Sequence, residues 1–457
     1  MKLFSNIKKF KNNLFIIEND KKIYFKDFLR FEKNFKFLKP RKLALLISSN
    51  TSEFLKVYLT FLRKDLVIML IDNETNSNDL EKIINIYKPF YIFCKRKKDI
   101  NLHNYKVSYK LSENNILERK KKVDYIIYKD LCLLLTTSGS TGSQKFVRIS
   151  KKNLLDNTKN ICKYLKIKKH HRTITTLPPN YTYGLSILNT HIFTGASICL
   201  NQFSFMEKKF WETANKYKVD NFGGVPFHFE ILKKLKFTKE KIQSLKYITQ
   251  AGGSLDIETK KYFVNDAKKN NYKFVIMYGQ VEATSRISYL PFEKIEKKIQ
   301  SVGVSIPGGK ISIEPKTSEI IYKGANVCLG YANSCDDLKK GDENRGKINT
   351  GDLGKIDQDG YLEVLGRKNR DIKLFGHRIN LDEVEQILKN GGYNYPCVGK
   401  NNKLIIFIKK NDKSSNILNF LKKKLKVHVA SFKFIKLKHF PKNTAGKISY
   451  TSLGKLI

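Results

Sequence analysis

The sequence predicts an α/β fold, with a large N-terminal domain of mixed, largely parallel sheets with packed helices and a small α+β C-terminal domain. The 457 residues exceed the size at which a single hydrophobic core usually stops growing. Short apolar runs alternate with helical patterns over most of the chain, as in residues 42–47 followed by residues 53–61. Beyond Gly366 this pattern changes to a more compact unit.

The compact C-terminal unit shows its own strand and helix signals. A strand is expected near residues 371–375, followed by a helix that begins at Asn380 and has Glu383 at the capping-box position. A second strand is expected at residues 404–408, and a second helix from about residue 415 to residue 426. These signals predict a second domain.

Basic residues are spread along nearly the whole chain. There are 87 Lys+Arg against 42 Asp+Glu, which gives a formal net charge of +45. Such a charge raises the alternative of a nucleic-acid-binding protein, which would show basic residues interleaved with exposed aromatics on one face. No such concentration is visible in the sequence. We therefore expect no nucleic-acid partner, and a diffuse positive field that attracts small anionic ligands.

The cysteines and the apolar stretches bear on the compartment. Seven cysteines are scattered along the chain without a C-x-x-C pair, which argues against a disulfide framework or a zinc site and for a reducing compartment. The apolar stretch at residues 14–17 is too short for the core of a signal peptide. The uncharged residues 173–206 contain prolines and glycines that suit a membrane span poorly. A soluble, cytoplasmic protein without stable membrane insertion is expected.

A phosphate-binding loop is predicted near the end of the first third of the chain. The apolar run at residues 131–135 leads into small hydroxyl residues and glycines that close on a lysine. Glycines allow a close backbone approach, hydroxyls donate hydrogen bonds, and the lysine supplies a positive charge. The pattern differs from the usual P-loop because Gln144 precedes the lysine, and taken alone it fits a plain loop equally well. The candidate phosphate-binding residues are Thr137, Ser138, Gly139, Ser140, Thr141, Gly142 and Lys145.

Four further blocks support the phosphate-binding interpretation. They are residues 278–282 (YGQVE), 350–354 (TGDLG), 366–378 (GRKNRDIKLFGHR) and 443–447 (NTAGK). At these blocks the chain resembles the AMP-forming adenylating superfamily of acyl-CoA synthetases, peptide-synthetase adenylation domains and firefly-type luciferases, and it looks most like the acyl-CoA synthetase-like ligases. The resemblance implies ATP-dependent activation of a carboxylic acid to an acyl-adenylate with release of pyrophosphate, and then transfer to a thiol.

The resemblance assigns a role to each block. The loop closing on Lys145 would bind the β and γ phosphates, Glu282 would be the catalytic carboxylate that holds Mg2+, and Lys447 would be the catalytic ammonium. The residues implied for adenine and ribose are Gly252, Gly253, Ser254, Tyr278, Gly279, Asp352 and Arg367. Residues 1–366 would form the ATP- and acid-binding domain, and residues 367–457 a mobile lid that carries the lysine.

Two positions depart from the family pattern. Val281 stands where the family usually has a Thr whose hydroxyl contacts the α-phosphate, and Asn369 stands where the hinge usually has Asp or Lys. Gly376 resembles the glycine that lines the pantetheine channel after the C-terminal domain rotates. The departures leave open a weakly active relative.

The resemblance also locates a substrate pocket, with Tyr181, Thr182, Tyr183, Gly184 and His228 as its candidate residues. Thr182 aligns with the Asp that amino-acid-activating relatives use to bind the substrate ammonium, so we expect a small carboxylic acid without an α-amino group. The implied co-substrates are ATP with Mg2+, and CoA or the pantetheine of an acyl carrier protein. Transfer to an amine remains an alternative.

Overall fold

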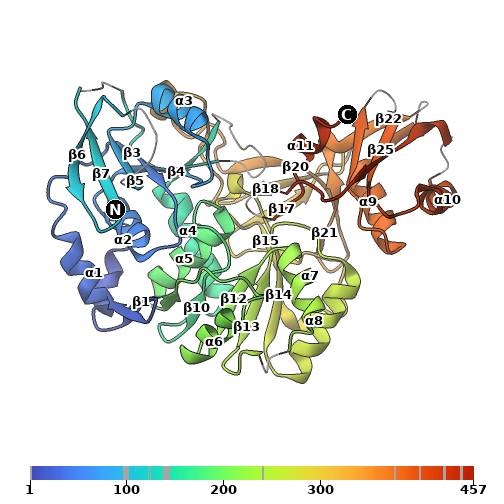
Figure 1. Ribbon diagram of the computed structural model, residues 1–457, viewed down its shortest axis with the longest axis horizontal. Helices are drawn as coiled ribbons and strands as arrows, with labels where there is room; N and C mark the ends of the chain where they lie inside the picture. The colour runs from blue at the N-terminus through green and yellow to red at the C-terminus, as the bar shows by residue number, and fades with distance from the viewer. Residues whose placement is uncertain are drawn as a thin grey trace.

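The large part of the chain consists of two sheets with helices between them and on both outer faces (Figure 1). The computed structural model describes residues 3–457 except 96–101, 122, 124, 137–144, 239–240, 375–376, 401–402, 426–428 and 443–445. The strand order confirms the predicted α/β class with mixed, largely parallel sheets.

The first sheet has eight strands in the order β19-β9-β8-β4-β3-β5-β7-β6. Its central strands run parallel, and the pairs at both ends are antiparallel. The strands are β3 (Leu43–Ile47), β4 (Val67–Ile71), β5 (Tyr91–Lys95), β6 (Tyr105–Lys110), β7 (Asn114–Arg119), β8 (Leu131–Thr136), β9 (Phe146–Ser150) and β19 (Gly330–Ala332).

The second sheet has nine strands in the order β16-β15-β14-β13-β12-β10-β11-β1-β2. The run from β14 to β1 is parallel. The strands are β1 (Leu14–Glu18), β2 (Lys21–Tyr24), β10 (Arg172–Ile174), β11 (Ser197–Cys199), β12 (Asn221–Gly224), β13 (Tyr247–Gln250), β14 (Lys273–Tyr278), β15 (Ser288–Leu290) and β16 (Val304–Ser305).

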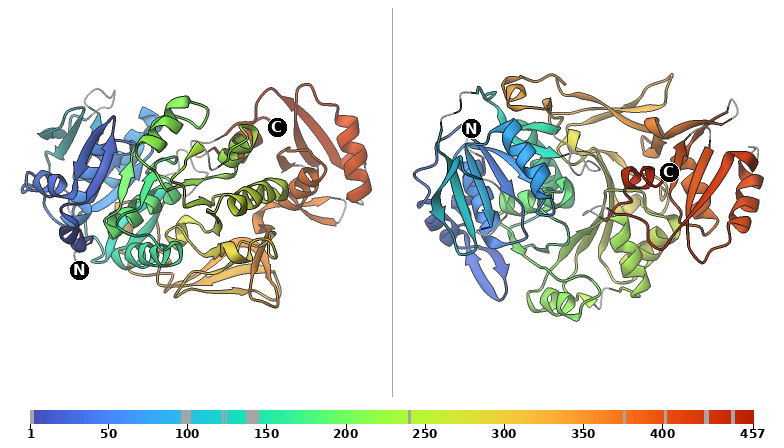
Figure 2. Two further views of the ribbon diagram at one scale, coloured as in Figure 1. Left: turned by 90° about the horizontal axis from the view of Figure 1, so that it is seen from below. Right: turned by 45° about the horizontal axis from the view of Figure 1, so that its top comes forward.

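Three smaller sheets follow in the chain. The first is antiparallel and orders β17 (Lys310–Ile313), β18 (Glu319–Lys323), β20 (Lys347–Ile356) and β21 (Leu362–Arg367). The second pairs β22 (Asp371–Leu374) with β23 (His377–Asn380), and the third orders β24 (Cys397–Lys400), β25 (Lys403–Lys409) and β26 (Phe432–Leu437). The last two sheets lie to one side of the large part in every view (Figures 1 and 2).

The α-helices of the described chain are α1 (Phe25–Glu32), α2 (Ser52–Arg63), α3 (Ser77–Tyr87), α4 (Lys151–Leu165), α5 (Thr182–Thr194), α6 (Lys208–Lys216), α7 (Pro226–Lys234), α8 (Ile257–Lys269), α9 (Leu381–Asn390), α10 (Ser414–Lys424) and α11 (Tyr450–Gly454). The 3-10 turns used below are η3 (Val281–Ala283) and η6 (Lys368–Arg370). The strand expected near 404–408 and the helix expected near 415–426 are confirmed as β25 and α10.

Strand β3 explains why the first sheet carries helices on both faces. All five of its residues are apolar and buried, as expected for a central parallel strand. Because successive side chains point to opposite faces, Ala44 and Leu46 pack toward α2 and α5, whereas Leu43, Leu45 and Ile47 pack toward α3. The second sheet is covered in the same way by α6, α7 and α8 on its outer face.

Helices α4 and α5 fill the space between the two sheets. Leu154 and Leu185 join the core cluster of the first sheet, whereas Leu165 and Ile187 pack against Val275 and Met277 of the second sheet's cluster. A helix that is apolar on every side is stable only when it is buried on every side. The sequence of α5, TYGLSILNTHIFT, approaches this character, because it has no Asp, Glu, Lys or Arg and its buried Asn189, Thr190 and His191 have hydrogen-bond partners.

No helix among the described residues has the length and apolar character that crossing a bilayer requires. All seven cysteines are free thiols. Cys132 and Cys199 are buried in apolar surroundings, where they act as small hydrophobic side chains.

Gly195, at the C-terminal end of α5, allows a test of how tightly this helix packs against Phe10. Gly195 caps the helix at φ +71°, and a Cβ added there would lie 2.3 Å from Cγ of Phe10. Gly195→Ala should lower the thermal unfolding midpoint by several degrees, since left-handed strain of about 1–2 kcal/mol adds to the steric overlap.

The matched control is Gly360→Ala, because Gly360 has φ +82° but no atom within 4 Å of an added Cβ. This variant carries the left-handed strain without the overlap, so its midpoint should fall less. Equal shifts for the two variants would contradict tight packing of α5 against Phe10.

Candidate active site

Tyr278 and Arg367 both contact the carboxylate of Asp352, and the sequence predicts all three residues for nucleotide binding. The Tyr278 hydroxyl, at the end of β14, donates to Oδ2 of Asp352 at 2.5 Å, and Nε of Arg367 lies 3.0 Å from Oδ1. The sheet aligns this pair, because Asp352 on β20 is the register partner of Arg367 on β21. Burial raises the pKa of Asp352, and Arg367 and the Tyr278 hydroxyl oppose that shift.

At two of the predicted glycines, the backbone lies so close to neighbouring atoms that a Cβ would overlap with them. A Cβ on Gly279 would lie 2.1 Å from the carbonyl oxygen of Ser285, so any side chain there would displace the segment after η3. Gly252 has φ +85°, and a Cβ there would lie 2.4 Å from the Tyr181 hydroxyl. Gly253 and Ser254 follow on the exposed turn after β13.

A second group lies between η3 and β19. Oε1 of Glu282 accepts a hydrogen bond from the Tyr331 hydroxyl at 3.0 Å, and the Lys145 ammonium lies 3.7 Å from the centre of the Tyr331 ring. Burial, reinforced by Glu282, raises the pKa of Tyr331, so the phenol keeps its proton and donates. Glu282 and Lys145 therefore both contact Tyr331, and their joint role in phosphate and Mg2+ binding stays a prediction.

The remainder of the predicted phosphate loop lies outside the described residues, namely Thr137, Ser138, Gly139, Ser140, Thr141 and Gly142. Lys145 is exposed where this segment enters β9.

Glu282 fits the way in which Mg2+ is usually held, through one or two carboxylates together with phosphate oxygens and water. Within the described parts of the chain, no cluster of three or more His, Cys, Asp or Glu residues could hold a metal ion. The residues present therefore suit a cation that arrives with a phosphate ligand and do not form an all-protein cage.

Lys447 reaches this region from the other end of the chain. Its ammonium lies 5.4 Å from the centre of the Tyr181 ring. Burial and the nearby Arg367 guanidinium lower the pKa of Lys447 to about 8, and Asp352 opposes the shift. Lys442, on the same segment, lies with its ammonium 3.5 Å from the centre of the Phe227 ring. Lys442 and Lys447 thus lie against Phe227 and Tyr181, respectively.

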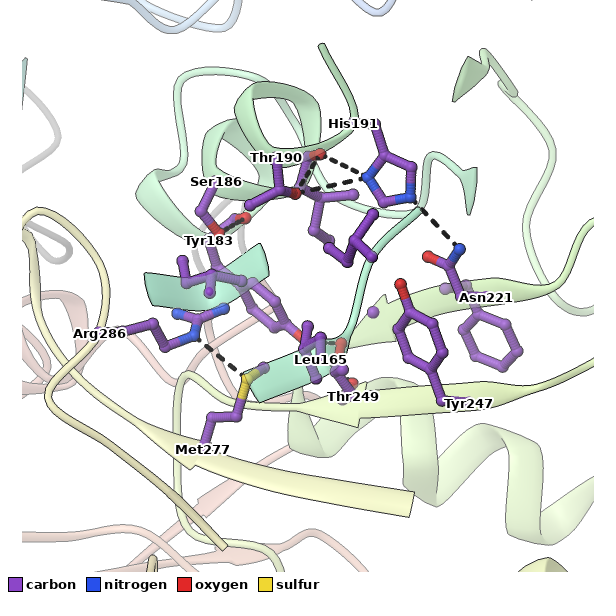
Figure 3. Close-up of a pocket in the computed structure, with 15 residues that line it drawn as sticks. Leu165, Tyr183, Ser186, Thr190, His191, Asn221, Tyr247, Thr249, Met277 and Arg286 are labelled. Atoms are coloured by element: carbon purple, nitrogen blue, oxygen red, sulfur yellow. Dashed lines mark hydrogen bonds between the residues drawn. The ribbon is translucent and has the colours of Figure 1, made fainter. Parts of the chain in front are cut away.

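Tyr183 and Thr182, two of the five predicted pocket residues, line different cavities. Tyr183 lines the cavity of Figure 3, and Thr182 lines a second one beside Asn157 and Asn189. Gly184 faces the backbone of Pro178, which a Cβ would approach to 2.4 Å. His228 lines neither cavity and packs against Phe205 with its pKa lowered to about 4 by burial.

The cavity in Figure 3 lies between α5 and the strands β12, β13 and β14, and its volume of about 20 Å³ for a water-sized sphere gives room for about one water molecule. Its polar lining includes Arg286, which the sequence reasoning missed. Nothing in its spacing distinguishes Arg286 from the other basic residues of a chain with 87 Lys+Arg.

The two departures from the family pattern have different surroundings. Val281 is buried and belongs to the core cluster between the sheets. Asn369 lies on η6 between two anchored neighbours, since Lys368 pairs with Glu319 at 2.7 Å and Arg370 with Asp382 at 2.9 Å. Gly376 lies outside the described residues.

Residues 38–332 match the AMP-binding enzyme family. The chain belongs to this family. The match covers more than half of the 457 residues and confirms the resemblance predicted from the five sequence blocks.

Individual relatives of this AMP-binding enzyme are distant. It is 28% identical over 345 residues to oxalate–CoA ligase of Saccharomyces cerevisiae, an alignment that covers 70% of this chain and 62% of the yeast protein. It is 25% identical over 336 residues to 2-succinylbenzoate–CoA ligase of Bacillus subtilis, covering 69% and 67%. The chain spans less than two thirds of the length of the yeast relative.

The fold is shared over the whole chain with solved structures. O-succinylbenzoate coenzyme A synthetase from Bacillus subtilis, in complex with AMP, superposes with a TM-score of 0.80 at 18% identity, over 99% of this chain and 98% of that one. ATP-bound MatB from Rhodopseudomonas palustris superposes with a TM-score of 0.81 at 20% identity, over 100% and 99%.

The environment of Lys447 predicts an unusual titration. Burial also lowers the pKa of Lys260 to about 8, so we expect the reductively 13C-methylated protein to show two lysine signals that titrate near pH 8, of which one is absent from Lys447→Arg. Arg367→Gln should raise the pKa of Lys447, because removing a neighbouring cation favours the protonated ammonium, and Asp352→Asn should lower it. Shifts in the opposite directions would show that Lys447 does not lie beside this pair.

Proposed function

We propose that this AMP-binding enzyme activates a small carboxylic acid with ATP and transfers the acyl group to a thiol. The proposal rests on the position of Lys447. Its ammonium lies beside the Tyr181 ring, and both members of the Asp352–Arg367 pair act on its pKa. Residues from the far end of the chain thereby stand where a nucleotide and an acid can lie together. The relatives are named as CoA ligases, which supports CoA as the thiol.

In the first half-reaction, a carboxylate oxygen of the acid attacks the α-phosphorus of ATP. The bond between that phosphorus and the bridging oxygen breaks, and pyrophosphate leaves. We assign the Lys447 ammonium to the negative charge that develops between the acid and the α-phosphate. Mg2+ supplies charge neutralisation of the phosphates, and Glu282 would hold it. Solved relatives have been captured with ATP and magnesium ion and with an acyl-adenylate.

We assign the remaining predicted residues to the nucleotide. Asp352 suits the ribose hydroxyls, because a buried carboxylate with two oxygens can accept from both. In this role the hydroxyls would replace or share the contacts of Tyr278 and Arg367. The turn of Gly252, Gly253 and Ser254 would lie beside adenine, and the segment from Thr137 to Lys145 would bind the phosphates.

In the second half-reaction, a thiol attacks the acyl carbon of the adenylate, loses its proton and displaces AMP. The acceptor would be CoA or the pantetheine of an acyl carrier protein. We propose that residues 367–457 form a domain that rotates relative to residues 1–366 at η6, and that Gly376 then borders the thiol channel. One site would thereby serve both half-reactions. We place the reaction in the cytoplasm, which suits seven free thiols.

Pyrophosphate exchange into ATP across a panel of carboxylic acids tests the proposal. Lys447→Ala should lower acid-dependent exchange by about 100- to 1,000-fold, because the ammonium stabilises charge that develops only in the transition state. The same variant should still convert a supplied acyl-adenylate to thioester, since rotation would remove the lysine from the site in that step. Lys455→Ala, an exposed change near the same end of the chain, is the matched control. Equal loss of both steps would contradict the rotation.

Glu282 gives a separate test of magnesium binding. Glu282→Gln should lower exchange at least about tenfold and raise the Mg2+ concentration needed for half-maximal rate, because a neutral amide binds a hard cation poorly. Tyr331→Phe removes the hydroxyl that donates to Glu282 but keeps the carboxylate, so its effect should be smaller. An unchanged Mg2+ dependence in Glu282→Gln would remove this residue from the metal site.

A further inference from the structure

Arg148 on β9 is a fully buried cation beside the edge strand of the first sheet. Its Nε donates a hydrogen bond to the Tyr331 carbonyl at 3.0 Å, and its Nη2 donates to the Leu329 carbonyl at 3.2 Å. These carbonyls belong to β19 and to the residue before it. Because β19 has three residues and lies at the end of the sheet, few backbone hydrogen bonds hold it. The guanidinium therefore adds two contacts to a weakly held strand.

The same guanidinium holds the loop that follows β19. Its Nη1 donates to the carbonyls of Lys340 and Gly341, the second at 3.2 Å, and its Nη2 pairs with the Glu343 carboxylate. The Glu343 amide donates in turn to the Leu329 carbonyl at 2.9 Å. Both ends of the segment 329–343 are thus joined to one side chain of β9.

Gly330 leaves the space that this ion pair occupies. It is the register partner of Arg148 and has φ +126°, a conformation that favours glycine. A Cβ there would lie 2.5 Å from Oε2 of Glu343 and 3.0 Å from Nη2 of Arg148. Any other residue at this position would therefore displace the pair.

The strand that Arg148 holds carries Tyr331, which contacts two residues predicted for phosphate and Mg2+ binding. The Tyr331 hydroxyl donates to Oε1 of Glu282 at 3.0 Å, and the Lys145 ammonium lies 3.7 Å from the centre of the ring. The Cys328 amide, just before β19, donates to the Glu282 carbonyl at 2.8 Å. A shift of β19 would consequently move the contacts of both Glu282 and Lys145.

Stability alone does not explain a buried cation at this position. Replacing a buried ion pair by packed apolar side chains is often neutral or stabilising, because taking charges out of water is costly. A guanidinium has five N–H donors in one rigid plane, so it can fix several acceptors in a single geometry. Arg148 uses this property to hold two separate stretches of backbone and one carboxylate.

We infer that Arg148 is a positioning residue, which fixes Tyr331 and thereby sets the placement of the Lys145 ammonium and the Glu282 carboxylate for Mg2+ and phosphate. The inference rests on the proposed function, because it assigns Lys145 to the phosphates and Glu282 to Mg2+. Since the Arg148 side chain is fully buried, it acts through Tyr331 and not on the ligand itself.

The Mg2+ dependence of pyrophosphate exchange tests this role. Arg148→Gln should raise the Mg2+ concentration needed for half-maximal rate at least about tenfold, as is typical when a group that orients a metal ligand is lost, and should change the KM for the acid less than about twofold. The matched control is Arg63→Gln. Arg63 is also buried, but it pairs with Glu32 at 2.8 Å and donates to the Phe4 carbonyl. This control should lower the thermal unfolding midpoint and leave the Mg2+ dependence unaltered.

A double-mutant cycle shows whether Arg148 acts through Tyr331. Tyr331→Ala removes both the ring and the hydroxyl, so it should raise the Mg2+ requirement by itself. Adding Arg148→Gln to Tyr331→Ala should then raise the requirement by less than about twofold, because residues that act through one contact are not additive. Independent, multiplying effects, or an unchanged Mg2+ requirement in Arg148→Gln, would overturn the inference and leave the proposed function intact.

Glu343→Gln is a milder variant for the case that Arg148→Gln does not fold. The Glu343 side chain is 50% exposed, and the amide oxygen of a glutamine can still accept from the guanidinium. The Mg2+ requirement should rise about threefold, because a hydrogen bond to a neutral amide is roughly half as strong as one to a carboxylate. An unchanged requirement in Glu343→Gln would then overturn the inference.

Calorimetric titration with ATP, at several Mg2+ concentrations and without acid, separates this inference from the proposed activity. ATP binding that needs more Mg2+ in Arg148→Gln than in the wild type, without exchange for any acid, would support the positioning role and overturn the activity. Acid-dependent exchange with the wild-type Mg2+ dependence in Arg148→Gln would do the reverse.

Discussion

The burial of α5 between two sheets is the constraint on which the rest of the molecule depends. The helix packs against the first sheet through Leu185 and Leu188, and against the second through Tyr183 and Ile187. Since both faces are in a core, the helix cannot shift toward one sheet without opening a space at the other. Both cavities are lined by α5, so its position sets their shape.

The Asp352 carboxylate connects this rigid part to the C-terminal residues. It is 5% exposed and holds the Tyr278 hydroxyl on one side and the Arg367 guanidinium on the other. Arg367 also donates its backbone amide to Asp382, and Lys368 pairs with Glu319. Polar contacts dominate here, in contrast to the apolar layers between the sheets. A junction held by ion pairs near solvent is weaker and more easily exchanged than a packed core, which is the property that the proposed domain rotation would require.

Several features were predictable because they depend on local sequence. Strand β3 and its neighbours are short runs of apolar residues, and the alternation of strands and helices indicated parallel sheets before any contact was known. The family was recognisable from motifs that are contiguous in the chain, and the match over residues 38–332 confirms it. The pocket role of His228 stays a prediction, since its ring packs against Phe205 and lines neither of the two cavities described above.

The sequence by itself determined the fold class and the family, because hydrophobic periodicity and contiguous motifs are properties of neighbouring residues. Only the tertiary structure decided which side chains share a site. Lys447 and Tyr181 are far apart in the chain, and their meeting depends on the packing of the terminal segment against Phe227. Arg286 was indistinguishable from other basic residues until the packing of η3 and Asn326 placed it, buried, beneath α5. A buried charge requires specific partners whereas an exposed charge is solvated by water, and which residues are buried depends on the whole fold.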